Sequence, residues 1–212
     1  MLSLADFFDH LRLMPFRWKI RENNELSGIG DARVWQAAMA PELWSASVTL
    51  RTSKSALAEA MAARIRALRG ARDTFLFRDP FRCFPASDPG GAIIGASTVT
   101  VQSVGVSLNT ISLAGLPAGY RITTGDKLQV TSAAYPDKVA FLEFSTDAIA
   151  AGNGVLPATD VFPNVPPWVA AGNAAVLVRP ACKCVIVPGS VSEGTVNGSI
   201  TAGQGFQIIQ KK

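Results

Sequence analysis

Few residues in this sequence could carry acid–base or nucleophilic chemistry. An activated nucleophile needs a base, and the chain has a single histidine, His10, on the polar side of a predicted helix, which is typical of a solvated side chain. The sequence has no G-x-S-x-G elbow, no G-x-x-x-x-G-K-S/T phosphate loop and no H-E-x-x-H pair. Gly28-Ile-Gly30 lacks the third glycine and the preceding strand of a dinucleotide fingerprint. These classes of enzyme are disfavoured.

Paired carboxylates are the remaining catalytic pattern. The acidic residues of the second half lie among turn residues, where aspartate is common for structural reasons. They are Asp126, Asp137, Glu143, Asp147 and Asp160. Since a sequence does not fix their separation in space, a small hydrolase that uses two carboxylates stays an alternative. A pocket with two facing acids of perturbed pKa would support it.

The three cysteines predict neither a metal site nor a disulfide framework. Cys182 and Cys184 form a C-x-C pair without a second pair or a companion histidine, and Cys83 stands apart. We expect reduced, partly buried thiols and no cofactor. Asn197-Gly198-Ser199 matches a glycosylation acceptor formally, but Asn-Gly here is better explained as a hairpin turn.

One basic and aromatic segment could suit single-stranded nucleic acid. Arg17, Lys19 and Arg21 alternate with Phe16, Trp18 and Ile20, so a strand would point Trp18 away from the basic side chains and into the core. The formal net charge of +4 is also modest for a nucleic-acid reader.

Composition indicates a folded chain with two differently built halves. The 212 residues are 48% hydrophobic and 17% charged, enough for a sizeable core. Residues 1–90 contain 23 charged side chains and residues 91–212 only 13, which predicts two architectural parts. No apolar run reaches the ~18–20 residues that span a bilayer, and Asp6 and Asp9 occupy the place of a signal peptide's apolar stretch. We expect a soluble protein made in the cytoplasm.

Hydrophobic periodicity in the first half predicts two helices and several strands. A short helix is expected near residues 4–12. A second helix, capped by Ser53 or Ser55, is expected to run to about Leu68 and to be terminated by Gly70. Strands are expected in three places, and a long polar hairpin loop from Arg21 to Arg33 lies between the first and the second. They cover residues 16–21, 44–50 and 74–77.

From Gly90 onward the pattern is all β. Short alternating stretches separated by Gly, Pro, Asn and Asp favour a barrel or sandwich. Residues 152–167, which contain four prolines, are expected to be irregular.

The order of these features resembles the distal tail proteins of long-tailed phages and of phage-like gene transfer agents. The resemblance depends on Trp44-Ser45 and its strand, the helix ending in Leu68-Arg69-Gly70, and Thr74–Pro80. In the second half, residues 112–118 and 124–130 and Arg179-Pro180 are similar to the β-rich region that follows the helix in that family. The resemblance covers nearly the whole chain, but its motifs are packing and turn patterns without a chemical signature.

The resemblance implies a mainly β (α+β) fold: a β-sandwich belt domain with a flanking helix, and an inserted small OB-like β-barrel. We would assign residues 1–90 and 181–212 to the belt and 91–180 to the barrel. It also implies a structural virion protein of the tail tip, without catalysis or cofactors. Such proteins form a ring, commonly hexameric, that joins the tail tube protein to the hub or baseplate protein and gives passage to DNA, with no membrane insertion.

The long loop between the early strands commonly reaches a neighbouring subunit in such rings. The residues expected to make the ring contact are Arg21, Glu22, Asn23, Asn24 and Glu25. A carbohydrate-binding module for host attachment is the other alternative, with Trp168, Tyr120 and Tyr135 as possible sugar-stacking residues.

Overall fold

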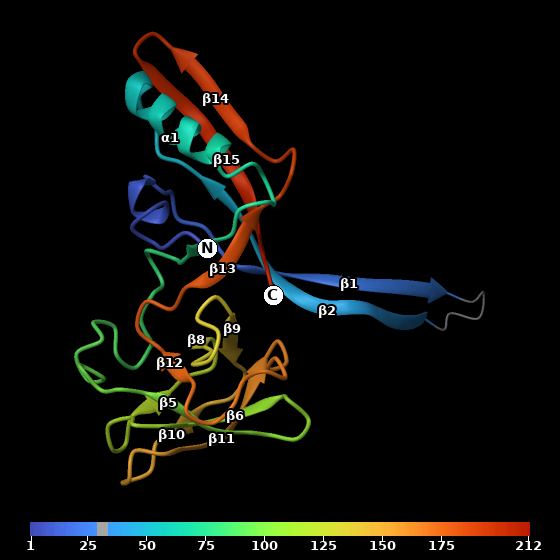
Figure 1. Cartoon of the computed structure of the whole chain (residues 1–212), viewed down its shortest axis with the longest axis vertical. Helices are drawn as coiled ribbons and strands as arrows, with labels where there is room; N and C mark the ends of the chain where they lie inside the picture. The colour runs from blue at the N-terminus through green and yellow to red at the C-terminus, as the bar shows by residue number, and fades with distance from the viewer. Residues whose placement is uncertain (29–33) are drawn as a thin grey trace.

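The computed structural model describes residues 1–28 and 34–212. Within these ranges the chain forms a seven-stranded antiparallel sheet, a closed six-stranded barrel and one α-helix (Figure 1). The sheet and the barrel stack along the long axis, and a two-stranded ribbon projects sideways from the level where they meet. The predicted mainly β fold with a flanking helix and a small barrel is confirmed.

The sheet is built around the long C-terminal strand β15. Its main path runs β1-β2-β15-β13-β4, while β3 and β14 also pair with β15. The bounds are β1 Lys19–Gly28, β2 Val34–Thr49, β3 Ser53–Lys54, β4 Phe75–Phe77, β13 Cys182–Ile186, β14 Ser192–Asn197 and β15 Ile200–Gln210. Alternate residues of β2, from Trp44 to Val48, are buried as the period of two predicts, and the predicted Asn197-Gly198 turn joins β14 to β15 with Gly198 at φ +61°.

Helix α1, Ser55–Ala67, covers part of this sheet and confirms the predicted helix. Met61 and Ile65 are buried in the sheet core, and the Gln204 side-chain amide donates to the Ala58 carbonyl at 3.1 Å. The predicted serine cap is wrong: Lys54 occupies the N-cap and no side chain caps the helix. Ser53 instead belongs to strand β3 and pairs with Thr201 of β15. The left-handed backbone that ends the helix spans Arg69 at φ +52° and Gly70 at φ +67°.

The N-terminal segment differs from the predicted helix over residues 4–12. Only a 3₁₀ turn, η1 Phe8–His10, forms there, although Ser3 and Asp6 make the reciprocal hydrogen bonds of a capping box. Consecutive Phe7 and Phe8 are both buried, against Phe75 and Phe77 respectively. A regular helix would turn the second side chain by ~100° from the first, so a tight turn suits these contacts better.

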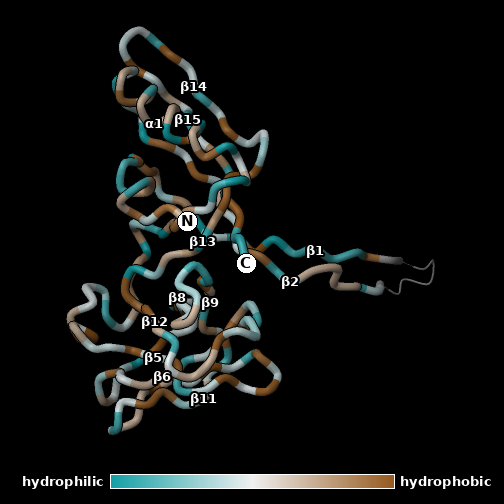
Figure 2. Tube along the Cα trace, in the orientation of Figure 1, coloured by the Kyte–Doolittle hydropathy of each residue, from teal (hydrophilic) through white to brown (hydrophobic). Residues whose placement is uncertain are grey.

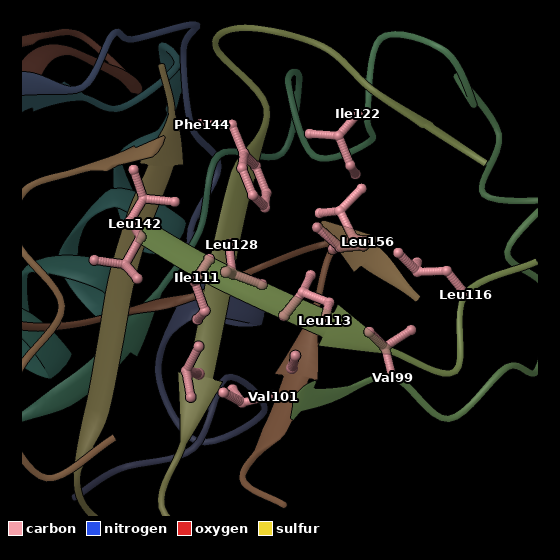
Figure 3. Close-up of a cluster of buried hydrophobic side chains, with 14 of the residues drawn as sticks. Val99, Val101, Ile111, Leu113, Leu116, Ile122, Leu128, Leu142, Phe144 and Leu156 are labelled. Atoms are coloured by element: carbon pink, nitrogen blue, oxygen red, sulfur yellow. The ribbon is translucent and has the colours of Figure 1, made fainter. Parts of the chain in front are cut away.

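The barrel closes in the order β11-β6-β5-β12-β8-β9. Its strands are β5 Thr100–Val104, β6 Thr110–Ala114, β8 Lys127–Thr131, β9 Val139–Phe144, β11 Leu156–Phe162 and β12 Ala174–Val176, with the short pair β7 Arg121–Ile122 and β10 Ala148–Ile149 beside them. Aliphatic side chains such as Leu113, Leu128 and Leu156 fill the interior (Figure 3). The barrel interior is therefore filled by buried side chains.

Strand β11 corrects in part the expectation that residues 152–167 are irregular: residues 156–162 form a strand, while residues 152–155 and 163–167 are irregular as predicted. Pro157 lies inside the strand, but the register shifts between Leu156 and Thr159, and this irregularity accommodates a residue without an N–H donor. The number of prolines therefore did not predict β11, which is stabilised by pairing with β6 and β9.

The two hydrophobic cores use different parts of the chain. The barrel core takes its residues from 94–177, whereas the sheet core takes them from 7–77 and 182–208, with one exception. That exception is Phe141, on barrel strand β9, which packs in the sheet core. Barrel and sheet are thus joined through a shared buried side chain.

Substitution of Gly115 tests the backbone packing of the barrel. Gly115 has φ +85°, and a Cβ there would lie 2.1 Å from the Thr98 carbonyl oxygen, whereas Gly119 has φ +73° and open space. We expect Gly119→Ala to cost ~1–2 kcal/mol of unfolding free energy through backbone strain alone. Gly115→Ala should cost ~2 kcal/mol more, because the Thr98 backbone must move. Urea denaturation measures both, and equal losses would contradict the close approach.

A second prediction concerns Asp147, whose carboxylate links the segment after β9 to the turn before β8. Asp147 accepts hydrogen bonds from the Thr124 N–H at 2.8 Å and from the Arg121 guanidinium at 2.9 Å, and these contacts lower its pKa to about 2. Its stabilising effect is therefore present above about pH 4 and is lost as the pH falls toward 2. Asp147→Asn should lower the urea midpoint near pH 7, and the difference from wild type should shrink below pH 4. The exposed Asp137→Asn variant is the control and should leave the urea midpoint near pH 7 unchanged.

Candidate functional site

The projecting ribbon is a two-stranded arm made by residues 21–28 of β1 and 34–43 of β2. Strand β15 pairs with β2 only over residues 45–49 of β2. Strand β1 pairs with β2 along the whole ribbon, from Lys19 opposite Ser45 to Gly28 opposite Val34. Among the described residues no third strand pairs with the arm beyond Ser45. Since an isolated two-stranded hairpin is at best marginally stable in water, the arm is the part of the molecule most in need of a partner.

All five residues predicted to make a ring contact lie on the arm, but on a strand. Arg21, Glu22, Asn23, Asn24 and Glu25 belong to β1, where the sequence had predicted a loop from Arg21 to Arg33. Polar composition suggested a loop, but cross-strand pairing with β2 extends these residues. The part of the predicted loop at 29–33 lies outside the described residues.

The arm also presents apolar side chains that sequence reasoning missed. Leu26, Trp35 and Met39 are 68%, 64% and 64% exposed. Figure 2 shows β1 largely teal along the arm, whereas the facing stretch of β2 is mostly tan. The run of apolar residues from Val34 to Ala40, interrupted only by Gln36, was the signal in the sequence. Large apolar side chains gathered on one exposed element are typical of an interaction surface.

The base of the arm is fixed to the barrel by an aromatic joint. Trp44 lies where β2 leaves the sheet, and its indole N–H donates to the Phe141 carbonyl at 2.9 Å. The ring centroids of Trp44 and Trp18 lie 5.7 and 5.2 Å from that of Phe141. Trp18 is half-buried in this joint, as the alternation predicted. Sheet, arm and barrel therefore meet at one desolvated cluster of rings.

A cavity of about 580 Å³ opens beside this joint. We call it the base pocket; its walls come from residues 17–18, the segment 79–89 that leaves β4, the barrel residues 124–127 and 143, and residues 177 and 180. Arg17, Phe81 and Arg82 are exposed at this pocket, with Phe81 47% exposed. The pocket thus combines an accessible ring with two guanidinium groups.

The acidic side chains of the base pocket already have partners. Asp79 accepts hydrogen bonds from the N–H groups of Phe81 and Arg82 at 2.8 and 3.1 Å. Asp126 accepts them from Ala86 and Thr123, both at 2.8 Å. Burial raises the pKa of Asp126, and these backbone hydrogen bonds partly oppose the rise. Both carboxylates hold loops in place.

The third acid of the pocket, Glu143, forms an ion pair with Lys127. The Lys127 ammonium lies 4.2 Å from the Trp44 ring centroid, and burial lowers its pKa to about 8. The structure thus brings Asp126 and Glu143 into one pocket and adds Asp79, which sequence reasoning had missed. The other predicted acids lie outside this pocket: Asp137 and Asp160 are exposed, and Asp147 accepts the Thr124 N–H.

The remaining chemical candidates are dispersed. His10 is exposed, and Cys83, Cys182 and Cys184 are buried free thiols, as predicted for the cysteines. Within residues 1–28 and 34–212 no three His, Cys, Asp or Glu side chains are grouped to hold a metal ion. No helix in these ranges is long and apolar enough to cross a membrane.

The aromatic residues considered for sugar stacking do not form a platform. Tyr120 is buried in the barrel core, and Trp168 is half-buried against it. Tyr135 alone of the three is exposed, with the Lys138 ammonium 4.5 Å from its ring centroid. The arrangement therefore offers no shared face on which a sugar could stack on two rings.

Comparison with protein-family models and with curated proteins found no match to this chain.

Replacing Phe141 tests the aromatic joint. Truncating a buried phenylalanine costs ~3–5 kcal/mol, and at Phe141 the loss should fall on both the sheet core and the barrel strand that carries it. We expect Phe141→Ala to speed amide hydrogen exchange in β2 and β15 as well as in β9. Phe144→Ala, on the same strand but buried in the barrel core, should act mainly within the barrel. Unchanged exchange in β2 and β15 of Phe141→Ala would show that the joint does not couple the two parts.

Proposed function

We propose that the chain is a structural virion protein of the tail tip, a distal tail adaptor of a long-tailed phage or phage-like gene transfer agent. In this proposal a ring of copies, six by resemblance to that family, joins the tail tube protein to the hub or baseplate protein. Residues 1–90 and 181–212 form the belt of the ring, and residues 91–180 form an inserted barrel. The protein is made in the host cytoplasm and acts without catalysis.

The observation that supports this proposal is the projecting arm. Its two strands have no sheet neighbour among the described residues, and it carries Leu26, Trp35 and Met39 in exposed positions. A second subunit that covered these side chains would bury apolar area and stabilise the ribbon at once. In a ring, each arm would contact a different surface of its neighbour, which makes the contact heterologous.

The charge of the chain is compatible with a conduit. Six copies would carry six times the formal charge of +4, which is +24. A positive ring would attract the phosphate backbone without sequence preference, so contact with DNA in transit would be transient and salt-dependent. This part of the proposal concerns passage and not sequence recognition.

Light scattering of the purified chain, followed by negative-stain imaging, tests the proposal. We expect a species of about 134 kDa, six times the 22.4 kDa of one chain, with a central hole. The double variant Trp35→Ser, Met39→Ser should reduce the assembly to single chains. Its far-UV circular dichroism spectrum should stay that of the folded chain, because both residues are exposed in the single chain. Ile149→Ser, at an equally exposed apolar position on the barrel, is the control and should leave the assembly intact. A single chain at every concentration would contradict the proposal.

A further inference from the structure

The seven-stranded sheet has two chemically different faces. One carries the sheet core, where Trp44 and Val48 of β2 and Ile208 of β15 are buried together with side chains of α1 and of the N-terminal segment. Since side chains alternate along a strand, the residues between them lie on the opposite face. There Ser47 and Gln207 are exposed. We call this second face the open face.

A hollow of about 270 Å³ lies on the open face, where β1, β2 and β15 run side by side. Lys19 and Arg21 of β1 line it, and both are exposed. The other polar groups of its lining are the side chains of Ser45, Ser47 and Gln207. Ammonium, guanidinium, hydroxyl and amide groups all donate hydrogen bonds, so the hollow suits a ligand rich in acceptor oxygens.

A third cation lies further along the same face. Ser45 of β2 pairs with Ile209 of β15, and both residues line the hollow. Lys211 comes two residues after Ile209 and is exposed, and its backbone N–H donates to the Lys183 carbonyl at 2.9 Å. This hydrogen bond continues the ladder between β13 and β15, so alternation places the Lys211 side chain on the open face as well.

The strand segments of the open face contain four cationic residues and no acid. They span residues 19–21, 43–49, 183–187 and 205–211. Among the described residues the cations of β1 and β15 form no ion pair. Two acids come from adjoining segments: Glu42 interacts with Lys212, and the carbonyl of Asp137 accepts the Lys183 ammonium at 2.9 Å. We therefore leave Lys183 out of the cation group.

This charge balance distinguishes the open face from the base pocket. In the base pocket the guanidinium groups of Arg17 and Arg82 lie beside the carboxylates of Asp79, Asp126 and Glu143. Opposite charges in one pocket largely cancel each other's field at a distance. Of the two hollows, the open face is therefore the one that attracts a polyanion.

We propose that the open face around Lys19, Arg21 and Lys211 binds the phosphate backbone of double-stranded DNA. This inference rests on the proposed function and names the surface that DNA in transit would touch. Two strand spacings separate β1 from β15, so the cations spread over ~10 Å, which is the axial rise of about three phosphates in one DNA strand. Trp44 and Phe206, the aromatic residues of these segments, are buried, so the open face offers no ring for base stacking. Binding is therefore independent of sequence.

Fluorescence anisotropy with a labelled duplex of ~30 base pairs tests this inference, in ~50 to ~200 mM salt and with two unrelated sequences. The face variant carries Lys19→Gln and Lys211→Gln and keeps Arg21, which is also a predicted ring contact. At ~50 mM salt its affinity should fall at least ~10-fold, because two phosphate contacts are lost. The slope of log K against log salt concentration should become shallower by about 2, equally for both sequences.

Two further variants are the controls. Lys19→Arg with Lys211→Arg keeps both charges and should bind the duplex like wild type. Arg64→Gln with Arg72→Gln removes the same charge as the face variant, but from exposed positions on α1 and just after it. It should leave both the affinity and the salt slope near those of wild type.

The inference is wrong if wild type does not bind the duplex at ~50 mM salt, or if the face variant loses no more affinity than the variant at Arg64 and Arg72. Light scattering of the same samples separates this result from the proposed function. Rings whose DNA affinity is unchanged in the face variant would overturn the inference and leave the ring standing. A wild-type chain that never assembles would contradict the proposed function, even if the open face binds DNA.

Discussion

The hydrogen bond from the Trp44 indole to the Phe141 carbonyl, 2.9 Å long, lies at the point on which the rest of the molecule depends. Trp44 ends the part of β2 that belongs to the sheet, begins the arm and holds the barrel strand β9 in the sheet core. A buried N–H or carbonyl without a hydrogen-bond partner costs free energy. The hydrogen bond between Trp44 and Phe141 therefore fixes the position of the indole ring relative to β9 and also stabilises the fold. Few other contacts tie three parts of the chain together.

This anchoring explains how a long arm can keep a fixed orientation relative to the sheet and the barrel. A two-stranded ribbon has little stability of its own, but its base is anchored between buried rings, and Lys127 covers the Trp44 face at 4.2 Å. The base pocket lies beside the same anchored region, with Trp18 in its wall. Arm and pocket therefore both adjoin the aromatic joint.

The acids of the base pocket have partners within the protein. Asp79 and Asp126 accept hydrogen bonds from backbone N–H groups, and Glu143 pairs with Lys127. The guanidinium groups of Arg17 and Arg82 and the Phe81 ring are exposed beside them. Guanidinium groups suit bidentate binding of a partner's carboxylates and stacking on its rings.

The sequence by itself determined the elements that local periodicity specifies: helix α1 with its left-handed end at Gly70, the alternation that buries Trp44 and Val48, and the mainly β texture of the second half. Tertiary structure decided the rest. Pairing with β2 turned the polar residues 21–25 into a strand, and a register shift let Pro157 enter β11. Asp79, Asp126 and Glu143 share a pocket although they are far apart in the chain. Periodicity reports only neighbours within a turn or a strand, whereas pairing register and pocket composition depend on contacts between distant residues, which no local pattern encodes.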